Sequence, residues 1–312
     1  MSELSGKIAL VTGATGFIGG ALARRLRESG ASVHGVTRRP TDGLDPRVRW
    51  WRADLEDADE TRRLIDEARP DLVFHFASLV SGDRALEMVL PALRANLLAA
   101  VNLMVASTER GRARLFFAGS MEEPSPGEEW PVPCSPYAAA KFAAGAYARM
   151  CHALYGTPVT WFRIFMVYGP GQPDERKLIP YVARALIRGE APAVSSGSRA
   201  VDWVYVDDVV EGVLAAAIRG GLEGRTLDIG SGRLVSVRTV VESLVQIVAS
   251  GATARFGAVA ARARERECVA DVQATHARLG WRPRVSLEEG LERTVAWYRA
   301  RGDGEGFAGG AP

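Results

Sequence analysis

Short apolar runs alternate with amphipathic segments along the first half of the chain. The runs predict strands and are "KIALVTG", "SVHGVTRR", "VRWWRADL", "DLVFHFAS", "RLFFAGS" and "PVTWFRIFMVYG". Helical patterns follow the first run and occupy about 57–68, 84–110 and 136–155. Because strands that alternate with helices favour a parallel sheet with right-handed crossovers, the predicted fold class is α/β with a doubly wound parallel sheet.

This rhythm breaks after Gly169. "GPGQPDERKLIP" is loop-like, "YVARALIRGE" is helical, and "VDWVYVDDVVEGVLAAAI" is a strand that runs into a helix. The pattern therefore divides the chain into a regular part, 1–170, to which 202–231 returns, and a smaller mixed part, 171–300. The tail 302–312 has no core-forming content and is expected to be disordered.

Composition narrows the class of protein. The 312 residues are 47% hydrophobic and 24% charged, as in ordinary soluble globular proteins. A net charge of +2 and scattered arginines do not favour nucleic-acid binding. No apolar run reaches the ~18 residues of a membrane span, and the N-terminus enters a strand without a secretory signal. The three cysteines, Cys134, Cys151 and Cys268, have no metal spacing, so we expect a cytoplasmic protein with reduced thiols, no metal and no membrane partner.

Three glycines follow the first predicted strand. Gly13, Gly16 and Gly19 form G-x-x-G-x-x-G at the opening of a helix. The helix N-terminus offers unpaired N–H groups and a partial positive charge to a pyrophosphate, and glycines let that phosphate approach the backbone. The pattern predicts a dinucleotide site, with a plain tight turn as the alternative.

The end of the second predicted strand bears on the choice of cofactor. NAD sites place Asp or Glu there to hold the ribose 2′-hydroxyl, whereas this chain has Thr37, Arg38 and Arg39. Two guanidiniums attract a 2′-phosphate, and no acid is present to repel it, so NADP(H) is favoured and NAD remains possible. The alternative is a solvated basic turn. Asp54, after the third strand, is a candidate partner for the adenine amine.

The stretch "CSPYAAAKFAAG" places a phenol and an ammonium on one helix. Ser135 suits the N-cap, Pro136 suits the first helical position and Gly156 suits the stop. Tyr137 and Lys141 are four residues apart and therefore share a face. On this stretch alone, an incidental pair on a surface helix is the simpler interpretation.

The motifs together resemble an extended short-chain dehydrogenase/reductase of the nucleotide-sugar epimerase/dehydratase/reductase group. The matching pieces cover about residues 7–300 and are "TGATGFIGG", "ADL", "HFAS", "NLLAAVNL", "FAGS", "YAAAK", "RIFMVYGPG", "DWVYVDDVV" and "LGWRP". The resemblance implies a Rossmann-type sheet that binds NAD(P) and a smaller mixed C-terminal subdomain that binds a nucleotide sugar. It also implies a homodimer formed through the helices at 84–110 and 136–155.

The resemblance implies a role for several residues. Tyr137 and Lys141 match the acid/base pair, Ser120 matches the hydroxyl that bonds the reacting oxygen, and Asn96 matches a support on the cofactor side. A phenol with a pKa of about 10 is a poor base near neutral pH, but a nearby ammonium and an oxidised nicotinamide lower that pKa. The implied cofactor set is Gly13, Thr15, Gly16, Phe17, Ile18, Gly19, Arg38, Arg39, Asp54, Leu55, Phe76, Ala77, Ser78, Asn96, Tyr137 and Lys141.

The pair after Ser120 bears on the reaction. In 4,6-dehydratases of the dTDP-glucose type an Asp–Glu pair stands there, whereas this chain has Met121 and Glu122. A thioether cannot donate a proton, so that dehydration is disfavoured. Glu122 keeps GDP-mannose-type dehydratases and decarboxylases open as alternatives, and a merely solvated Glu122 in an acidic, proline-rich loop is the simpler interpretation.

The substrate pocket departs from the family pattern. Met166 stands where relatives carry Asn, and Val201 stands where they carry Arg, for which Arg199 is a candidate substitute. Guanidinium groups suit phosphate oxygens, so Arg233, Arg262 and Arg264 are diphosphate candidates. The implied substrate set is Ser81, Met121, Met166, Lys177, Leu178, Arg199, Arg233 and Arg264.

These features favour NADPH-dependent reduction of a nucleotide-linked 4-keto-6-deoxy sugar, with Tyr137 as proton donor. A 4-epimerase of nucleotide sugars is the runner-up, followed by a 4,6-dehydratase or decarboxylase that uses Glu122. A non-catalytic dinucleotide sensor is the alternative from another class, and the intact Ser120, Tyr137 and Lys141 argue against it.

Overall fold

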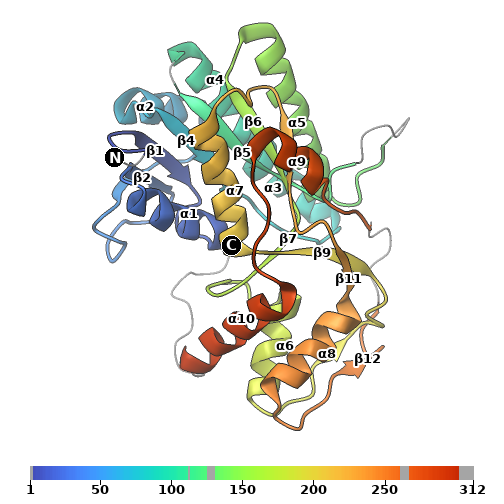
Figure 1. Cartoon of the computed structure of the whole chain (residues 1–312). Helices are drawn as coiled ribbons and strands as arrows, with labels where there is room; N and C mark the ends of the chain where they lie inside the picture. Colours follow the sequence, from blue (N-terminus) through green and yellow to red (C-terminus); the bar gives the residue numbers. More distant parts are fainter. Residues whose placement is uncertain (1–2, 112, 125–130, 261–266, 302–312) are drawn as a thin grey trace.

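A seven-stranded parallel sheet forms the centre of the molecule (Figure 1). The computed structural model describes residues 3–111, 113–124, 131–260 and 267–301. The strand order is β10-β6-β5-β4-β1-β2-β3, so the order reverses between β1 and β4. The strands are β1 (Ile8–Thr12), β2 (Ser32–Thr37), β3 (Arg49–Arg52), β4 (Leu72–His75), β5 (Arg114–Ser120), β6 (Val159–Ile164) and β10 (Thr226–Ile229). This arrangement confirms the predicted doubly wound α/β fold.

Helices cover both faces of this sheet (Figure 1). α1 (Phe17–Glu28) and α7 (Val206–Arg219) pack together, while α2 (Ala58–Ala68), α4 (Ala99–Arg110) and α5 (Pro136–Tyr155) form the other layer. Successive strand residues divide between two cores, with Phe116 in one and Phe117 in the other. Because side chains alternate along a strand, continuous apolar runs supply both layers.

A smaller mixed region follows the seven-stranded sheet. β9 (Ala200–Tyr205) pairs parallel with β7 (Met166–Tyr168) and antiparallel with β11 (Leu234–Ser236), while β8 (Ala193–Val194) pairs with β12 (Arg255–Phe256). The helices α6 (Leu178–Ile187), α8 (Val237–Val248) and α10 (Leu287–Arg301) pack together in this region, whereas α9 (Val272–Leu279) packs against β10 and α7 of the large sheet. Of the segment 202–231, β9 lies in this region, while α7 and β10 lie with the large sheet. The tail 302–312 lies outside the described residues.

The single strand expected in "PVTWFRIFMVYG" is two strands in different sheets. β6 ends at Ile164 and β7 begins at Met166. Phe165 lies between them, and its N–H donates to the carbonyl of Ile229 at the end of β10. The chain therefore leaves the large sheet at this residue and pairs next with β9.

The expected helix at 84–110 is built from several helical pieces. Residues Leu86–Met88 form a 3₁₀ turn, α3 spans Val89–Ala92, a π-helical segment spans Leu93–Leu98, and α4 follows. When two charged residues are allowed, Leu86–Arg110 is long and apolar enough to cross a membrane, which corrects the expectation that no run reaches that length. Core helices of soluble proteins meet the same criterion, and α4 packs against α2 and α5.

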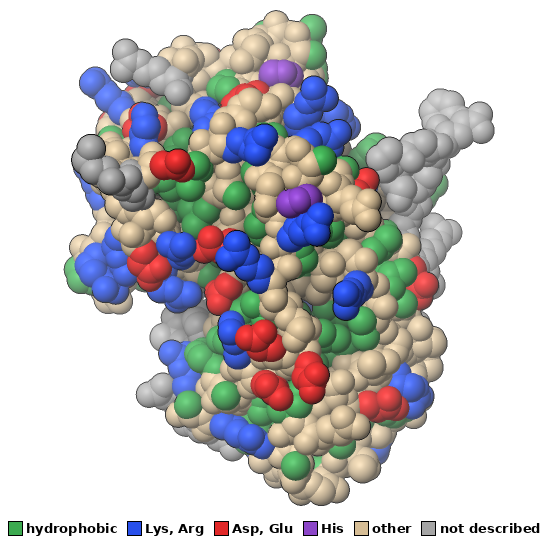
Figure 2. Space-filling view, in the orientation of Figure 1, with side chains coloured by type: hydrophobic (Ala, Val, Ile, Leu, Met, Phe, Trp, Pro, Cys, Tyr) green, Lys and Arg blue, Asp and Glu red, His purple; other side chains and the backbone are tan. Residues whose placement is uncertain are grey.

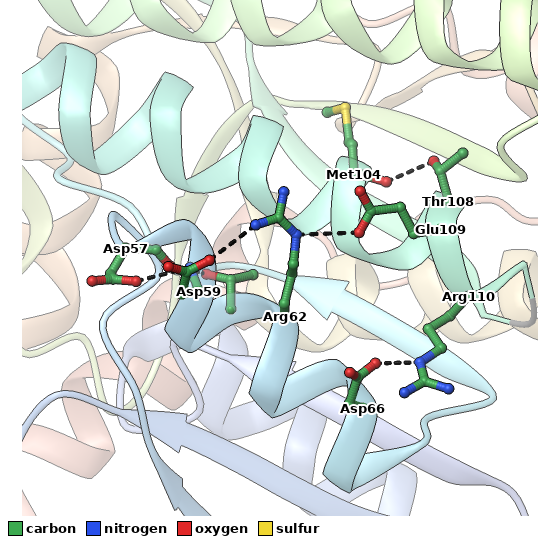
Figure 3. A network of polar contacts seen from close by, with 9 residues as sticks. Asp57, Asp59, Arg62, Asp66, Met104, Thr108, Glu109 and Arg110 are labelled. Atoms are coloured by element: carbon green, nitrogen blue, oxygen red, sulfur yellow. Dashed lines mark hydrogen bonds and ion pairs between the residues drawn. The ribbon is translucent and has the colours of Figure 1, made fainter.

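Charged side chains join α2 to α4 (Figure 3). Arg62 lies 3.0 Å from Asp59 and 3.2 Å from Glu109, and Arg110 pairs with Asp66. These pairs are solvent-exposed, so each contributes little to stability. On the face shown in Figure 2, Lys and Arg side chains are interspersed with acidic ones.

Candidate active site

Tyr137 and Lys141 lie on the buried side of α5. Ser135 caps this helix by accepting the N–H of Ala138 at 3.1 Å, and Gly156 ends it in the left-handed conformation. Tyr137 is 9% exposed and Lys141 is 2% exposed, which is not the environment of a surface pair. The Lys141 ammonium donates to the carbonyl oxygen of Ala118 on β5 at 2.7 Å. It also lies 5.9 Å from the centroid of the Tyr137 ring.

Burial shifts both groups toward their uncharged forms. It raises the pKa of the Tyr137 phenol well above its ordinary value, although hydrogen bonding with the side chains of Ser120 and Ser78 opposes that rise. Burial lowers the pKa of Lys141 to about 8, and the nearby carboxylate of Glu123 opposes that fall. The phenol therefore keeps its proton at neutral pH, as a proton donor must.

Asn96 holds the segment after β4, which contains candidate cofactor residues, close to α5. It lies buried in the π-helical segment, a distortion that often marks functional sites. Its side-chain oxygen accepts from the Ser78 hydroxyl at 2.7 Å and from the N–H of Leu79 at 2.9 Å. Its side-chain nitrogen donates to the carbonyl of Leu79 at 3.1 Å. Asn96 thereby fixes Ser78, whose hydroxyl faces Tyr137.

Glu122 is held between Ser120 and the start of α5. Its N–H donates to the Ser120 hydroxyl at 3.1 Å, and its Oε2 accepts from the Ser135 hydroxyl at 3.2 Å. The Cys134 sulfur lies 3.8 Å from the same oxygen. A carboxylate at a helix N-terminus is stabilised by the helix dipole. Glu122 is therefore half-buried and hydrogen-bonded, not merely solvated.

The glycine loop has the shape that a dinucleotide phosphate requires. Gly13 has φ +71°, and a Cβ there would lie 2.7 Å from the Ala77 nitrogen. A Cβ on Gly19 would overlap the Gly13 carbonyl. Gly16 is the N-cap of α1, where no described side chain caps the helix and no acid lies in the first turn. The N–H groups of this helix end therefore fit an anionic ligand.

The other candidate cofactor residues gather where the strand order reverses. Phe76, Ala77 and Ser78 follow β4 and are half-buried, and the first two lie directly against Gly13. The hydroxyl of Thr12 accepts from the N–H of Ala77 at 3.1 Å. Thr15 is exposed, Phe17 and Ile18 begin α1, and Leu55 is buried behind β3.

The basic turn after β2 has an acidic neighbour. The Arg38 side chain is 67% exposed, and its Nη1 lies 3.7 Å from Oε1 of Glu56. Arg39 is exposed, and its N–H donates to the Thr37 hydroxyl at 3.1 Å. Asp54 is half-buried and accepts the N–H of Glu56 at 3.0 Å. The stretch 37–39 contains no acid of its own, but Glu56, from the segment after β3, places a carboxylate beside Arg38.

The candidate substrate residues are spread over the C-terminal half, the loop after β4 and the turn after β5. Met121 is buried, and its carbonyl accepts from the Cys268 thiol at 3.3 Å, which brings the segment after residue 267 against the turn that follows β5. Arg233 is exposed, whereas the half-buried candidates are Ser81, Met166, Lys177, Leu178 and Arg199. Arg262 and Arg264 lie outside the described residues.

The acids Glu123, Asp202, Asp208 and Asp228 are buried, and the sequence pattern did not indicate the roles of Asp202 and Glu123 near the site. Asp202 is fully buried on β9 and accepts from the N–H and hydroxyl of Ser231 and from the N–H groups of Gly232 and Ala270, at 2.6–3.0 Å. It thereby fixes the loop that carries Arg233. The signal was an acid inside the apolar run "VDWVYV". The second acid, Glu123, had no comparable signal. Among the described residues, no group of three or more His, Cys, Asp or Glu could hold a metal.

Comparisons with known proteins identify the group of enzymes that this chain resembles. The profile of the NAD dependent epimerase/dehydratase family matches residues 9–230. A dTDP-glucose 4,6-dehydratase of Streptomyces griseus is 33% identical, with 93% of each chain covered. A UDP-glucose 4-epimerase of Mycolicibacterium smegmatis is 30% identical over 93% of this chain and 98% of its own. The solved structure of MoeE5 in complex with UDP-glucuronic acid and NAD is 32% identical, with a TM-score of 0.82, and the match covers 95% of this chain and all of that one.

Proposed function

The chain belongs to the NAD-dependent epimerase/dehydratase family, and from this premise we propose that it oxidises and reduces C4 of a nucleotide-linked sugar. The observation that carries the proposal is the meeting of three side chains at the end of β5. Ser120 ends that strand, Lys141 bonds to its backbone, and the Ser120 side chain acts on Tyr137 by lowering the pKa of its phenol. The carboxyl ends of strands in such sheets are where ligands bind.

Each of these residues has a distinct task in the proposed reaction. Tyr137 transfers a proton to or from the sugar oxygen, and Ser120 donates a hydrogen bond to that oxygen. The Lys141 ammonium stabilises the phenolate when Tyr137 has given up its proton. The dinucleotide, when bound on the glycine loop, supplies or accepts the hydride. Burial excludes water from the proton transfer.

A 4-epimerase is the first candidate for the finer activity. One relative supports it, because it is named a UDP-glucose 4-epimerase. The structure of MoeE5 holds UDP-glucuronic acid and NAD, which supports a nucleotide-sugar substrate and NAD as cofactor. Met121 argues against the dehydration named for the Streptomyces griseus relative, because its thioether cannot act as an acid. Glu122 is engaged with the N-cap of α5 and is a weaker candidate for a base.

A 4-ketoreductase that uses NADPH is the second candidate, and the turn after β2 favours it. Arg38 and Arg39 are both exposed there, where a 2′-phosphate would be bound. Cells keep NADPH largely reduced, so such a site would favour reduction of a 4-keto-6-deoxy sugar. The pairing of Arg38 with Glu56 weakens this argument, because that carboxylate opposes a second negative charge.

Cofactor content separates the two activities. We would purify the protein, identify any released dinucleotide and titrate NADPH and NADH by fluorescence. A 4-epimerase is expected to retain NAD and to interconvert UDP-sugars without added cofactor. A ketoreductase is expected to be purified empty and to oxidise NADPH with a 4-keto-6-deoxy nucleotide sugar. Dinucleotide binding with neither activity would support the non-catalytic sensor.

A pair of variants tests the basic turn. Arg38→Ala should weaken NADPH binding about tenfold and leave NADH binding unchanged if this guanidinium binds a 2′-phosphate. Arg62→Ala is the matched control, because Arg62 is a half-exposed arginine on α2 paired with Asp59 and Glu109. Equal losses for both cofactors in Arg38→Ala would count against an NADP site.

We also propose that the chain forms a homodimer and that its smaller region binds the nucleotide. Apolar side chains are exposed along the helical segment 86–98, at Leu86, Leu90 and Leu93. Others are exposed at the end of α5, at Leu154 and Tyr155. Exposed apolar side chains that gather on one helix often mark an interface. Lys177 and Arg233 remain candidates for the nucleotide and its diphosphate.

A further inference from the structure

Glu123 lies buried directly behind the residue that ends β5. Its Oε1 accepts the backbone N–H of Ser120 at 2.7 Å and the indole N–H of Trp161 at 3.1 Å. Its Oε2 lies 3.3 Å from the same indole nitrogen. Both donors favour a carboxylate over a protonated acid. An acid in a core is costly unless it is hydrogen-bonded, and here two elements supply the bonds.

Two glycines make room for this carboxylate and its indole partner. A Cβ on Gly119 would overlap both the Trp161 indole nitrogen and Oε1 of Glu123. A Cβ on Gly145 would lie 3.3 Å from the Trp161 ring. Gly145 is one helical turn after Lys141 on α5. The indole is therefore enclosed between β5 and α5, beside the turn that carries Lys141.

The carboxylate acts on the charges around it. Lys141 bonds to the carbonyl of Ala118, two residues before the amide that Glu123 holds, and the two charges attract each other. Arg163 on β6 also faces Glu123, and its own partner is Asp228 on β10 at 2.7 Å. Tyr137, whose phenolate Glu123 disfavours, lies on α5.

Two further ionisable groups belong to the same environment. His75 on β4 is fully buried and feels the charge of Lys141. Glu122 is the neighbouring carboxylate and acts on Tyr137. Burial raises the pKa of Glu123 above its usual value. The hydrogen bonds from Ser120 and Trp161 and the positive charges of Lys141 and Arg163 oppose that rise. Among these groups, Glu123 is the carboxylate whose charge opposes the lowering of the Lys141 pKa.

The geometry points to Glu123 as a positioning residue of the active site, which fixes the backbone of Ser120 and serves as the buried counter-charge of the Lys141 ammonium. The consequence of this role for catalysis rests on the proposed function, whereas the effect of Glu123 on the pKa of Lys141 does not. Loss of the negative charge should make Lys141 give up its proton more readily. It should also make Tyr137 ionise more readily, so both limbs of a pH–activity profile should move to lower pH.

The small number of lysines makes this effect directly measurable. The chain contains Lys7, Lys141 and Lys177, so lysine labelled with ¹³C at Cε gives three signals. Lys7→Arg and Lys177→Arg assign them. In the wild type, Lys141 is expected to titrate with a pKa of about 8. In Glu123→Gln, which keeps the shape and the acceptor oxygen, its titration should move down by about one pH unit.

A matched control separates charge from packing. Trp161→Phe removes one donor to Glu123 but leaves the carboxylate, so the Lys141 titration should stay close to that of the wild type. An unchanged Lys141 titration in folded Glu123→Gln would overturn the inference. If Glu123→Gln does not fold, a titration of the wild type tests the inference instead. Protonation of Glu123 should shift both the Trp161 indole resonance and the Lys141 signal at the same acidic pH. Separate transitions, or none at Lys141, would overturn it.

The activity measurement is kept distinct from this test. The profile of kcat/KM against pH for Glu123→Gln should move to lower pH by a similar amount, with kcat reduced more than KM is raised. If the wild type turns over no nucleotide sugar, the proposed function fails, but the Lys141 titration still decides the role of Glu123.

Discussion

The glycine loop offers a test in which strain and close approach can be measured separately. Gly13→Ala places a methyl group on a backbone with φ +71°. That methyl would lie 2.7 Å from the Ala77 nitrogen, 2.8 Å from the Phe76 carbonyl carbon and 2.9 Å from the Ala77 Cα. All three are backbone atoms of the segment that follows β4, so relief requires movement of the main chain and not of a flexible side chain.

A second glycine with almost the same conformation lacks this contact. Gly6 has φ +77°, and nothing lies within 4 Å of its Cβ position. Gly6→Ala therefore measures the conformational strain alone, about 1 kcal/mol. Gly13→Ala carries that strain together with overpacking of about 1–3 kcal/mol, for a total of roughly 2–4 kcal/mol.

Urea unfolding followed by far-ultraviolet circular dichroism compares the two free energies of unfolding. Dinucleotide titration then shows whether the loop still binds, and Gly13→Ala should bind more weakly than Gly6→Ala. Free energies of unfolding for the two variants within about 0.5 kcal/mol of each other would refute the reasoning, because surface substitutions scatter by about that amount.

Three other perturbations test the proton donor, the interface and the buried histidine. Tyr137→Phe should lower turnover about 10²–10⁴-fold without changing the melting temperature. The control Tyr147→Phe, on the exposed side of α5, should leave turnover unchanged. If Tyr137→Phe kept a tenth of the activity, Tyr137 would not be the proton donor. Leu90→Glu, at a side chain that is 60% exposed, should turn a dimer into a monomer in sedimentation experiments. The control Leu234→Glu should leave the dimer intact. A monomeric wild type would contradict the proposed interface. Burial lowers the pKa of His75 to about 3, so the native state binds no proton there when the unfolded state does, and stability is lost as pH falls below 6.5. The free energy of unfolding should drop by about 2 kcal/mol more between pH 7 and pH 5 than it does in His75→Gln, and equal drops would refute this.

Local signals predicted the large sheet and its helices because the same residues that form each element also bury it. "RLFFAGS" fills two cores, since Phe116 and Phe117 point to opposite faces. Ser135 and Gly156 set the ends of α5 through their own backbone and side-chain chemistry. The family resemblance, now confirmed, rests on such local motifs.

Long-range pairing was not predictable in this way. The division of "PVTWFRIFMVYG" at Phe165 follows from a bond to Ile229 and from the pairing of β7 with β9. The acid near Arg38 likewise comes from the segment after another strand. The pattern of one segment does not identify these partners, so the sequence indicated the basic turn after β2 but not its neighbour Glu56.

The same limit explains why two adjacent acids have different environments. Ser120 ends β5, and Met121 still bonds to Ile164 through its N–H. The chain then turns, with the N–H of Glu123 bonded to the carbonyl of Ser120 at 3.1 Å. This turn brings Glu123 back beneath the strand, where it accepts the N–H of Ser120, and directs Glu122 outward to the N-cap of α5. Of the two acids, Glu123 thus holds the end of β5 from behind, and Glu122 holds the start of α5. A substitution of Glu123 should therefore alter the proposed active site without removing a group that reacts, whereas Glu122 stays a weaker candidate for the base.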